Sequence, residues 1–143
     1  MTKGLNLWTI AEQSGVYLRD AADYSPSQRK PRECYCKPTL KRIGERRGAD
    51  HLRLTLRLMV GSEANRMALY ADAIRAVSDL VWNHPALVQR ASLVSEMDRV
   101  DLSALRTKAR VLRSPYGTAG TIYTLLAVQL GLPDQGDLFA RTA

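Results

Sequence analysis

The spacing of apolar residues is the feature that most constrains how this chain can fold. Between Ser62 and Trp82 the apolar side chains recur at intervals of three and four residues, which places them on one side of an α-helix. The same spacing returns from Pro85 to Val100 and from Asp101 to Leu112. The sequence therefore predicts helices that pack their apolar stripes against one another.

The segment from His51 to Val60 has features of both a helix and a strand. It reads HLRLTLRLMV, in which leucine alternates with arginine and threonine as in a half-buried strand. No second segment of the chain has a strand pattern, so a strand here would lack a hydrogen-bonding partner. Leucine and arginine are also good helix formers. We therefore expect a helix, with Asp50 as its N-cap.

These segments predict an all-α fold, a compact bundle of about six or seven helices followed by a flexible C-terminal tail. The chain divides into an N-terminal helical hairpin over residues 1–25, a proline-containing basic linker over 26–37, a bundle over 38–132 and a tail over 133–143. The helices expected in the bundle cover residues 39–47, 51–60, 62–82, 85–100, 101–112 and about 118–130. The residues expected to face inward include Leu87, Val88, Ala91, Val94, Met97 and Leu112.

The length and composition of the chain exclude several classes of protein. A chain of 143 residues is the size of one ordinary domain and can bury a core without disulfides or metals. No apolar run reaches the roughly 20 residues that a membrane span needs. The N-terminus lacks the apolar segment of a secretory signal. We therefore expect a cytoplasmic protein that is not inserted in a membrane.

Positive charge is concentrated in residues 29–57. This window holds ten basic and three acidic residues, so its net charge of +7 equals that of the whole chain. A local basic patch on a small protein indicates a polyanionic partner, most often nucleic acid, although it can also be a solvated face without a partner. We expect phosphate contacts from a flexible arm and from the two helices that follow it. The expected contact residues are Arg29, Lys30, Arg32, Lys41, Arg42, Arg46, Arg47, Arg53 and Arg57.

Two short segments resemble helix-turn-helix motifs. Ile10 to Val16 is similar to the core of that motif in lac-repressor-type regulators, with an apolar and a small residue before Gly15 and an apolar residue after it. The resemblance covers about eighteen residues, and the second helix would carry Asp20 and Asp23, which repel phosphate. In this segment Thr9 is expected to cap a helix over 10–14, and Gly15 to end it.

The second resemblance lies inside the basic window, from Ile43 to Ala49, with Leu54 further on. Its second helix would carry Arg53 and Arg57, which suit DNA better, although Arg57 occupies a position that is usually apolar. Either unit could read DNA, and the alternative for both is an ordinary helical hairpin in the core. A true helix-turn-helix would also favour a homodimer.

The C-terminal tail contains a peptide of a different kind. Residues 135–139, Gln-Gly-Asp-Leu-Phe, resemble the pentapeptide by which bacterial replication and repair proteins dock on the sliding clamp. Gln135, Asp137, Leu138 and Phe139 match that pattern, whereas Gly136 stands where leucine is common. The resemblance implies that the glutamine and the Leu-Phe pair enter an apolar pocket of the clamp. The alternative is that Leu138 and Phe139 pack on the protein's own bundle.

Metal binding and catalysis have little support in the sequence. Cys34, Cys36 and His51 offer three ligands, whereas structural zinc normally has four, from pairs spaced further apart. No local signature of a catalytic triad, a phosphate-binding glycine loop or a zinc protease is present. We therefore expect no cofactor, no metal and no enzymatic activity.

The sequence as a whole predicts a small all-α DNA-binding protein, a regulator or accessory factor like those common in phages and plasmids. The alternative is a protein that docks on the sliding clamp through residues 135–139 and recruits or blocks a DNA-handling activity. The two hypotheses are compatible, because a protein bound to the clamp lies beside DNA.

Overall fold

The computed structural model of the chain describes residues 6–16, 37–60 and 70–132. Within these ranges it contains seven α-helices and one short 3-10 helix, and no strand, which confirms the all-α prediction. The elements are α1 (Leu7–Gln13), α2 (Lys37–Arg47), α3 (Ala49–Met59), α5 (Ala71–Asn83), the 3-10 helix η3 (Pro85–Gln89), α6 (Leu93–Asp98), α7 (Leu102–Leu112) and α8 (Gly117–Gln129).

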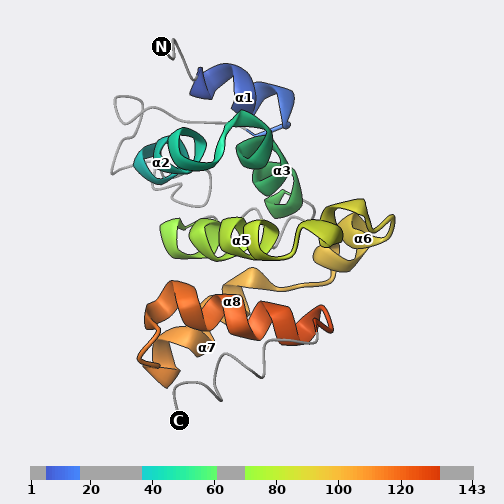
Figure 1. The fold of residues 1–143 in the computed structure, drawn as a ribbon. Helices are drawn as coiled ribbons and strands as arrows, with labels where there is room; N and C mark the ends of the chain where they lie inside the picture. Colours follow the sequence, from blue (N-terminus) through green and yellow to red (C-terminus); the bar gives the residue numbers. More distant parts are fainter. Residues whose placement is uncertain (1–5, 17–36, 61–69, 133–143) are drawn as a thin grey trace, which may run out of the picture.

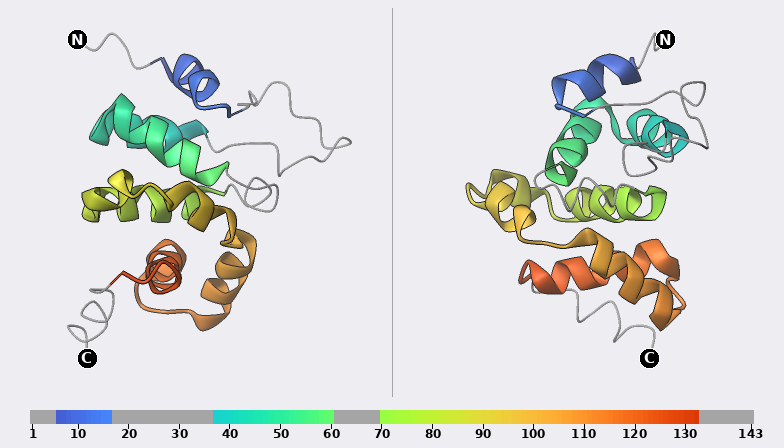
Figure 2. Two further views of the ribbon diagram at one scale, coloured as in Figure 1. Left: turned by 90° about the vertical axis from the view of Figure 1, so that its right-hand side faces the viewer. Right: turned by 180° about the vertical axis from the view of Figure 1, so that it is seen from behind.

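The helices stack in layers from one end of the molecule to the other (Figure 1). Helix α1 forms the first layer, α2 and α3 the second and α5 the third, while α7 and α8 lie on the far side of α5, an order that two further views preserve (Figure 2). Helix α5 contacts α2 and α3 on one side and α7 and α8 on the other. This helix therefore joins the two halves of the bundle.

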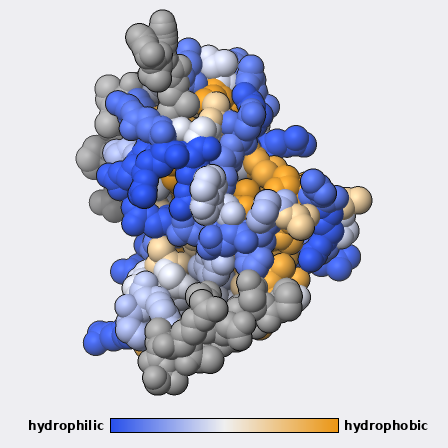
Figure 3. Space-filling view, in the orientation of Figure 1, coloured by the Kyte–Doolittle hydropathy of each residue, from blue (hydrophilic) through white to orange (hydrophobic). Residues whose placement is uncertain are grey.

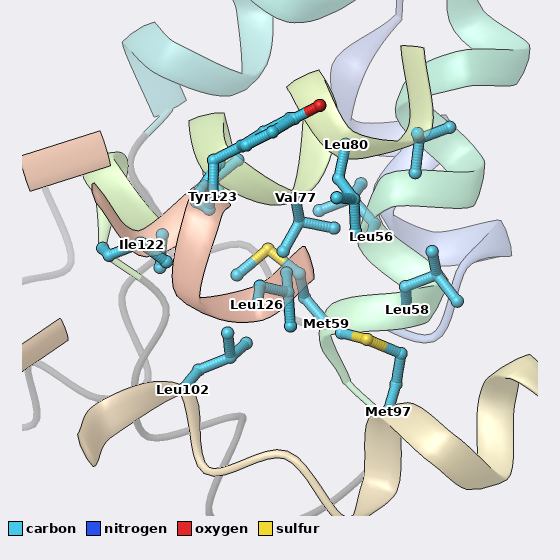
Figure 4. Close-up of a cluster of buried hydrophobic side chains, with 14 of the residues drawn as sticks. Leu56, Leu58, Met59, Val77, Leu80, Met97, Leu102, Ile122, Tyr123 and Leu126 are labelled. Atoms are coloured by element: carbon cyan, nitrogen blue, oxygen red, sulfur yellow. The ribbon is translucent and has the colours of Figure 1, made fainter. Parts of the chain in front are cut away.

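The core is continuous through α3, α5 and α8. Figure 4 shows Leu56 and Met59 of α3 pointing toward Val77 of α5 and Leu126 of α8. All four side chains are fully buried. Helix α3 also contacts α1, α2 and α6, so that it is enclosed on most sides. The prediction of a helix over residues 51–60 is confirmed, whereas the expected cap is wrong, because Gly48 occupies the N-cap and Asp50 lies in the first turn.

Left-handed glycines end the first and last helices. Gly15 (φ 76°) follows α1, and the backbone N–H of Val16 donates to the carbonyl of Ala11 at 2.8 Å. Gly131 (φ 72°) follows α8 in the same way. This geometry satisfies carbonyls that the helix end leaves free, and only glycine adopts it without strain. The turn at Gly15 was predicted, but Asn6 rather than Thr9 caps α1, because its side chain accepts from the Thr9 N–H at 3.2 Å.

In the middle of the chain, the helix boundaries differ from those that the spacing of apolar residues predicts. Of the helix expected over residues 62–82, residues 62–69 lie outside the described ranges, and α5 covers Ala71–Asn83 after an extended Tyr70. The single helix expected over residues 85–100 is wrong. Arg90 is extended and separates η3 from α6. Three residues of this segment that were expected to face inward are exposed instead: Val88, Ala91 and Val94.

The second half of the bundle matches the sequence more closely. Asp101 caps α7, as predicted, by accepting from the Ala104 N–H at 3.1 Å. Helix α8 begins at Gly117, just before the two threonines proposed as its start. Leu112 is 53% exposed, so the expectation that it faces inward is wrong. The part of the chain that the structure describes has no helix long and apolar enough to cross a membrane.

Candidate nucleic-acid interface

Helix α2 separates its basic residues from its apolar ones. Leu40 and Ile43 are buried, whereas Lys41, Arg42 and Arg46 are exposed, as the sequence predicted. This separation follows from the helical period, since residues three and four apart share one side. Figure 3 shows hydrophilic residues gathered over α2 and its surroundings, with apolar surface farther toward α6.

Helices α2 and α5 enclose a pocket of about 260 Å³ whose lining is strongly basic. We call it the arginine pocket. Four arginines face it against a single acidic residue, Asp79. Guanidinium groups present planar arrays of N–H donors that match phosphate oxygens, so several of them around one hollow form a site suited to a phosphate. The described residues that line it are Thr39, Arg42, Ile43, Arg46, Arg47, Arg75, Ser78 and Asp79.

Arg47 differs from the other arginines of the pocket because the protein holds it in place. Its guanidinium forms an ion pair with Asp79 at 2.8 Å and donates to the Ser78 carbonyl at 3.1 Å. Within the described residues no carboxylate forms an ion pair with Arg42, Arg46 or Arg75. These three exposed arginines therefore supply the positive charge that a ligand would meet.

Arg75 is the member of the pocket that sequence reasoning missed. It lies in α5, outside the basic window, and is exposed. Asp72 and Asp79 lie close to it along the same helix, so the net charge of this segment is not positive. The sequence therefore does not single out Arg75 as a binding residue. It joins the arginines of α2 only because α5 packs against that helix. Tertiary packing is therefore what completes the site.

A histidine and a tryptophan contact residues that line the arginine pocket. His51 Nε2 lies 3.0 Å from the Ser78 carbonyl oxygen and 2.9 Å from the Ser78 hydroxyl. The ring of Trp82 meets the His51 ring edge-on, with centroids 5.7 Å apart, and the Arg47 guanidinium lies 5.0 Å from the Trp82 ring. Contacts with His51 and Arg47 thus hold the indole beside a residue that lines the pocket.

Burial lowers the pKa of His51 below its ordinary value of 6.5, and the positive charge of Arg47 acts in the same direction. The folded state therefore prefers the neutral ring, so its stabilising contribution is complete above the unfolded pKa and is lost as pH falls through the folded pKa. We expect the Tm of the wild type to drop more than that of His51→Gln between about pH 7.5 and about pH 5.5. Thermal melts at both pH values test this, and an equal drop in the two proteins would contradict it.

Two other arginines predicted to contact phosphate, Arg53 and Arg57, lie on α3. The guanidinium of Arg53 has two partners within the protein: it forms an ion pair with Asp50 at 2.7 Å and donates to the Gln13 side chain of α1 at 3.1 Å. Arg57 is exposed on α3. The rest of the expected site residues lie outside the described parts of the chain. They are Arg29, Lys30 and Arg32 of the arm and Gln135, Asp137, Leu138 and Phe139 of the tail.

The second helix-turn-helix candidate corresponds in the structure to α2, Gly48 and α3. Gly48 has φ 97° and is the only residue between the two helices, while Gly44 is buried in α2. Helix α3 would be the reading helix, yet five of its residues are buried and it contacts α1, α2, α5 and α6. A helix that enters the major groove needs an open face. The arrangement thus favours phosphate contacts from α2 and α5 over insertion of α3 into DNA. The second helix of the N-terminal candidate lies outside the described residues.

No family model matches this chain, and neither a curated protein nor a solved structure matches it. Across the ranges that the structure describes, no three His, Cys, Asp or Glu side chains come close enough to hold a metal ion. Cys34 and Cys36 lie outside those ranges. Within the described residues, the arginine pocket is the feature with the clearest chemistry, because four arginines line it.

Proposed function

We propose that this protein binds nucleic acid, with DNA as the expected partner, as a regulator or accessory factor. The observation that carries the proposal is the meeting of Arg42, Arg46 and Arg47 of α2 with Arg75 of α5 around one pocket. Clustered arginines hold phosphate groups through charge and bidentate hydrogen bonds. Lys41 of α2 and Arg57 of α3 are also exposed and are further candidates for phosphate contacts.

The proposed contacts are to the sugar-phosphate backbone and do not require a base sequence. Lysine and arginine that neutralise phosphates release counterions, so affinity falls as salt rises. Such contacts position a protein on DNA without reading the bases. The proposal therefore explains attachment to nucleic acid and leaves sequence preference to other parts of the chain.

A salt titration tests this proposal directly. We expect binding of a fluorescent oligonucleotide at low salt, with log K falling against log salt at a slope of about −3 to −5, which corresponds to roughly four to six phosphate contacts. Fluorescence anisotropy measures the affinity at each salt concentration. A flat response, or no binding at the lowest salt, would contradict the proposal.

We also propose, from the sequence of the tail, that residues 135–139 dock on the bacterial sliding clamp. The supporting observation is the match of Gln135, Asp137, Leu138 and Phe139 to the clamp-binding pentapeptide. Two of the residues that would enter the clamp pocket, Leu138 and Phe139, are large and apolar, so truncating them removes much of the contact area.

A pull-down with purified clamp tests the docking proposal. We expect the Leu138→Ala/Phe139→Ala variant to lose retention by at least about tenfold, since two apolar anchors are removed. Gly136→Leu is the matched control, because leucine is common at that position, and it should be retained at least as well as the wild type. Equal retention of the wild type and the double variant would remove this proposal.

A further inference from the structure

Trp82 is an exposed aromatic residue beside the arginine pocket. It follows Ser78 and Asp79 by one turn of α5, and its side chain is 56% exposed. A large apolar ring left in solvent on an otherwise charged surface is a common mark of a contact site. The position of this ring beside clustered arginines indicates a ligand that carries both phosphate and flat apolar groups.

The surroundings of Trp82 fix the orientation of its ring. Arg47 lies 5.0 Å from the ring and His51 meets it edge-on, while both residues are anchored to Ser78. A side chain held in this way loses little conformational freedom on binding. The indole is thus a preorganised stacking surface at the edge of a phosphate site.

Single-stranded nucleic acid has the chemistry that fits this pair of features. Its unpaired bases expose their faces for stacking on aromatic side chains, and its backbone supplies phosphates alongside. In a duplex the bases already stack on one another, so a surface tryptophan has no base face to meet. Proteins that bind single strands combine a basic groove with aromatic stacking surfaces.

We propose that the arginine pocket and Trp82 together bind single-stranded nucleic acid, with phosphates among Arg42, Arg46 and Arg75 and a base stacked on the indole. This inference rests on the proposed nucleic-acid function and specifies its ligand. It predicts that the protein prefers a single strand over a duplex of the same length.

Trp8 provides a matched comparison within the same chain. It is 44% exposed, and the Lys37 ammonium lies 4.4 Å from its ring, so it too is an exposed tryptophan beside a cation. However, it belongs to α1, and its partner Lys37 does not line the arginine pocket, whereas Arg47, the partner of Trp82, does. Replacing Trp8 therefore removes a similar side chain without removing the proposed site.

The experiment measures binding of a short oligothymidylate, an oligouridylate and a duplex of equal length to the full chain. We expect Trp82→Ala to weaken binding of both single strands by about five- to a hundredfold and to change duplex binding less than about twofold. Trp82→Phe should retain most of the affinity, and Trp8→Ala should leave it unchanged. In Trp8→Phe protein, where Trp82 is the remaining tryptophan, both single strands should quench the fluorescence. Circular dichroism checks that each variant is folded.

The outcomes separate this inference from the function on which it rests. Equal losses for single strands and duplex in Trp82→Ala, or similar losses in Trp8→Ala and Trp82→Ala, would overturn the stacking site. Binding that depends on the arginines but not on Trp82 would overturn the inference and leave the proposed function standing. Absence of binding to every oligonucleotide at low salt would overturn both.

Discussion

Simultaneous replacement of Arg42, Arg46 and Arg75 by glutamine is expected to weaken nucleic-acid binding about a hundredfold at about 0.15 M salt. Each phosphate contact contributes about 0.7 on a single strand and about 0.9 on a duplex to the slope of log K against log salt, or roughly a four- to fivefold gain in affinity at that concentration. The slope of the variant should accordingly be shallower than that of the wild type by about 2 to 3 units. Anisotropy titrations at several salt concentrations measure both quantities.

The matched control removes the same charge from another surface. Arg99, Lys108 and Arg110 are exposed residues at the end of α6 and in α7, and none of them lines the arginine pocket. Their triple glutamine variant should bind nearly as well as the wild type, because only the general attraction is reduced. If both triple variants lost equal affinity, the protein would bind through its net charge and not through the pocket.

Replacement of Leu56 by alanine is expected to give a large loss of stability, about 2–5 kcal/mol in the free energy of unfolding. Leu56 is fully buried in α3 and points into the cluster formed with α5 and α8 (Figure 4). Truncation removes apolar contacts and leaves a cavity that the surrounding helices fill only in part. Urea denaturation of the wild type and the variant measures the difference.

Leu112→Ala is the matched control for Leu56→Ala. The same chemical change is made at a leucine that is 53% exposed at the end of α7, where it should cost no more than about 0.5 kcal/mol. Equal costs at the two positions would contradict the core described for α3, α5 and α8.

The alternating leucines of α3 show how far the sequence determines the fold. Leu52, Leu54, Leu56 and Leu58 suggest a strand by their spacing, yet the segment is a helix, as the lack of a partner strand and the helix propensities predicted. The structure explains the alternation. Helix α3 is enclosed by α1, α2, α5 and α6, so apolar residues are needed around most of its circumference.

The breaks between helices were less predictable. Val88, Ala91 and Val94 continue the apolar spacing past Arg90, where the backbone is extended, and they are exposed in the folded chain. Spacing reports which residues could share a helical side, but it does not report where the backbone leaves the helical conformation. No proline or glycine marks the break at Arg90.

The candidate site was predictable only in part, for a similar reason. The exposed arginines of α2 were identified from the basic window, because charge and helical period are local properties of the sequence. Arg75 and Trp82 were not identified, because the packing of α5 against α2 is what brings Arg75 to the pocket and Trp82 to Arg47. Arg53 stays a predicted phosphate contact, and its guanidinium also pairs with Asp50 and donates to Gln13, which the sequence did not indicate.

The most direct test of the nucleic-acid site is to map it on the protein by NMR. Amide spectra of isotope-labelled protein, recorded with and without a short oligonucleotide, identify the residues whose surroundings change on binding. We expect the largest shifts in residues 39–47 of α2 and 75–82 of α5, with little change in α7 and α8. Shifts confined to α7 and α8, or absent throughout at low salt, would contradict a nucleic-acid site at the arginine pocket.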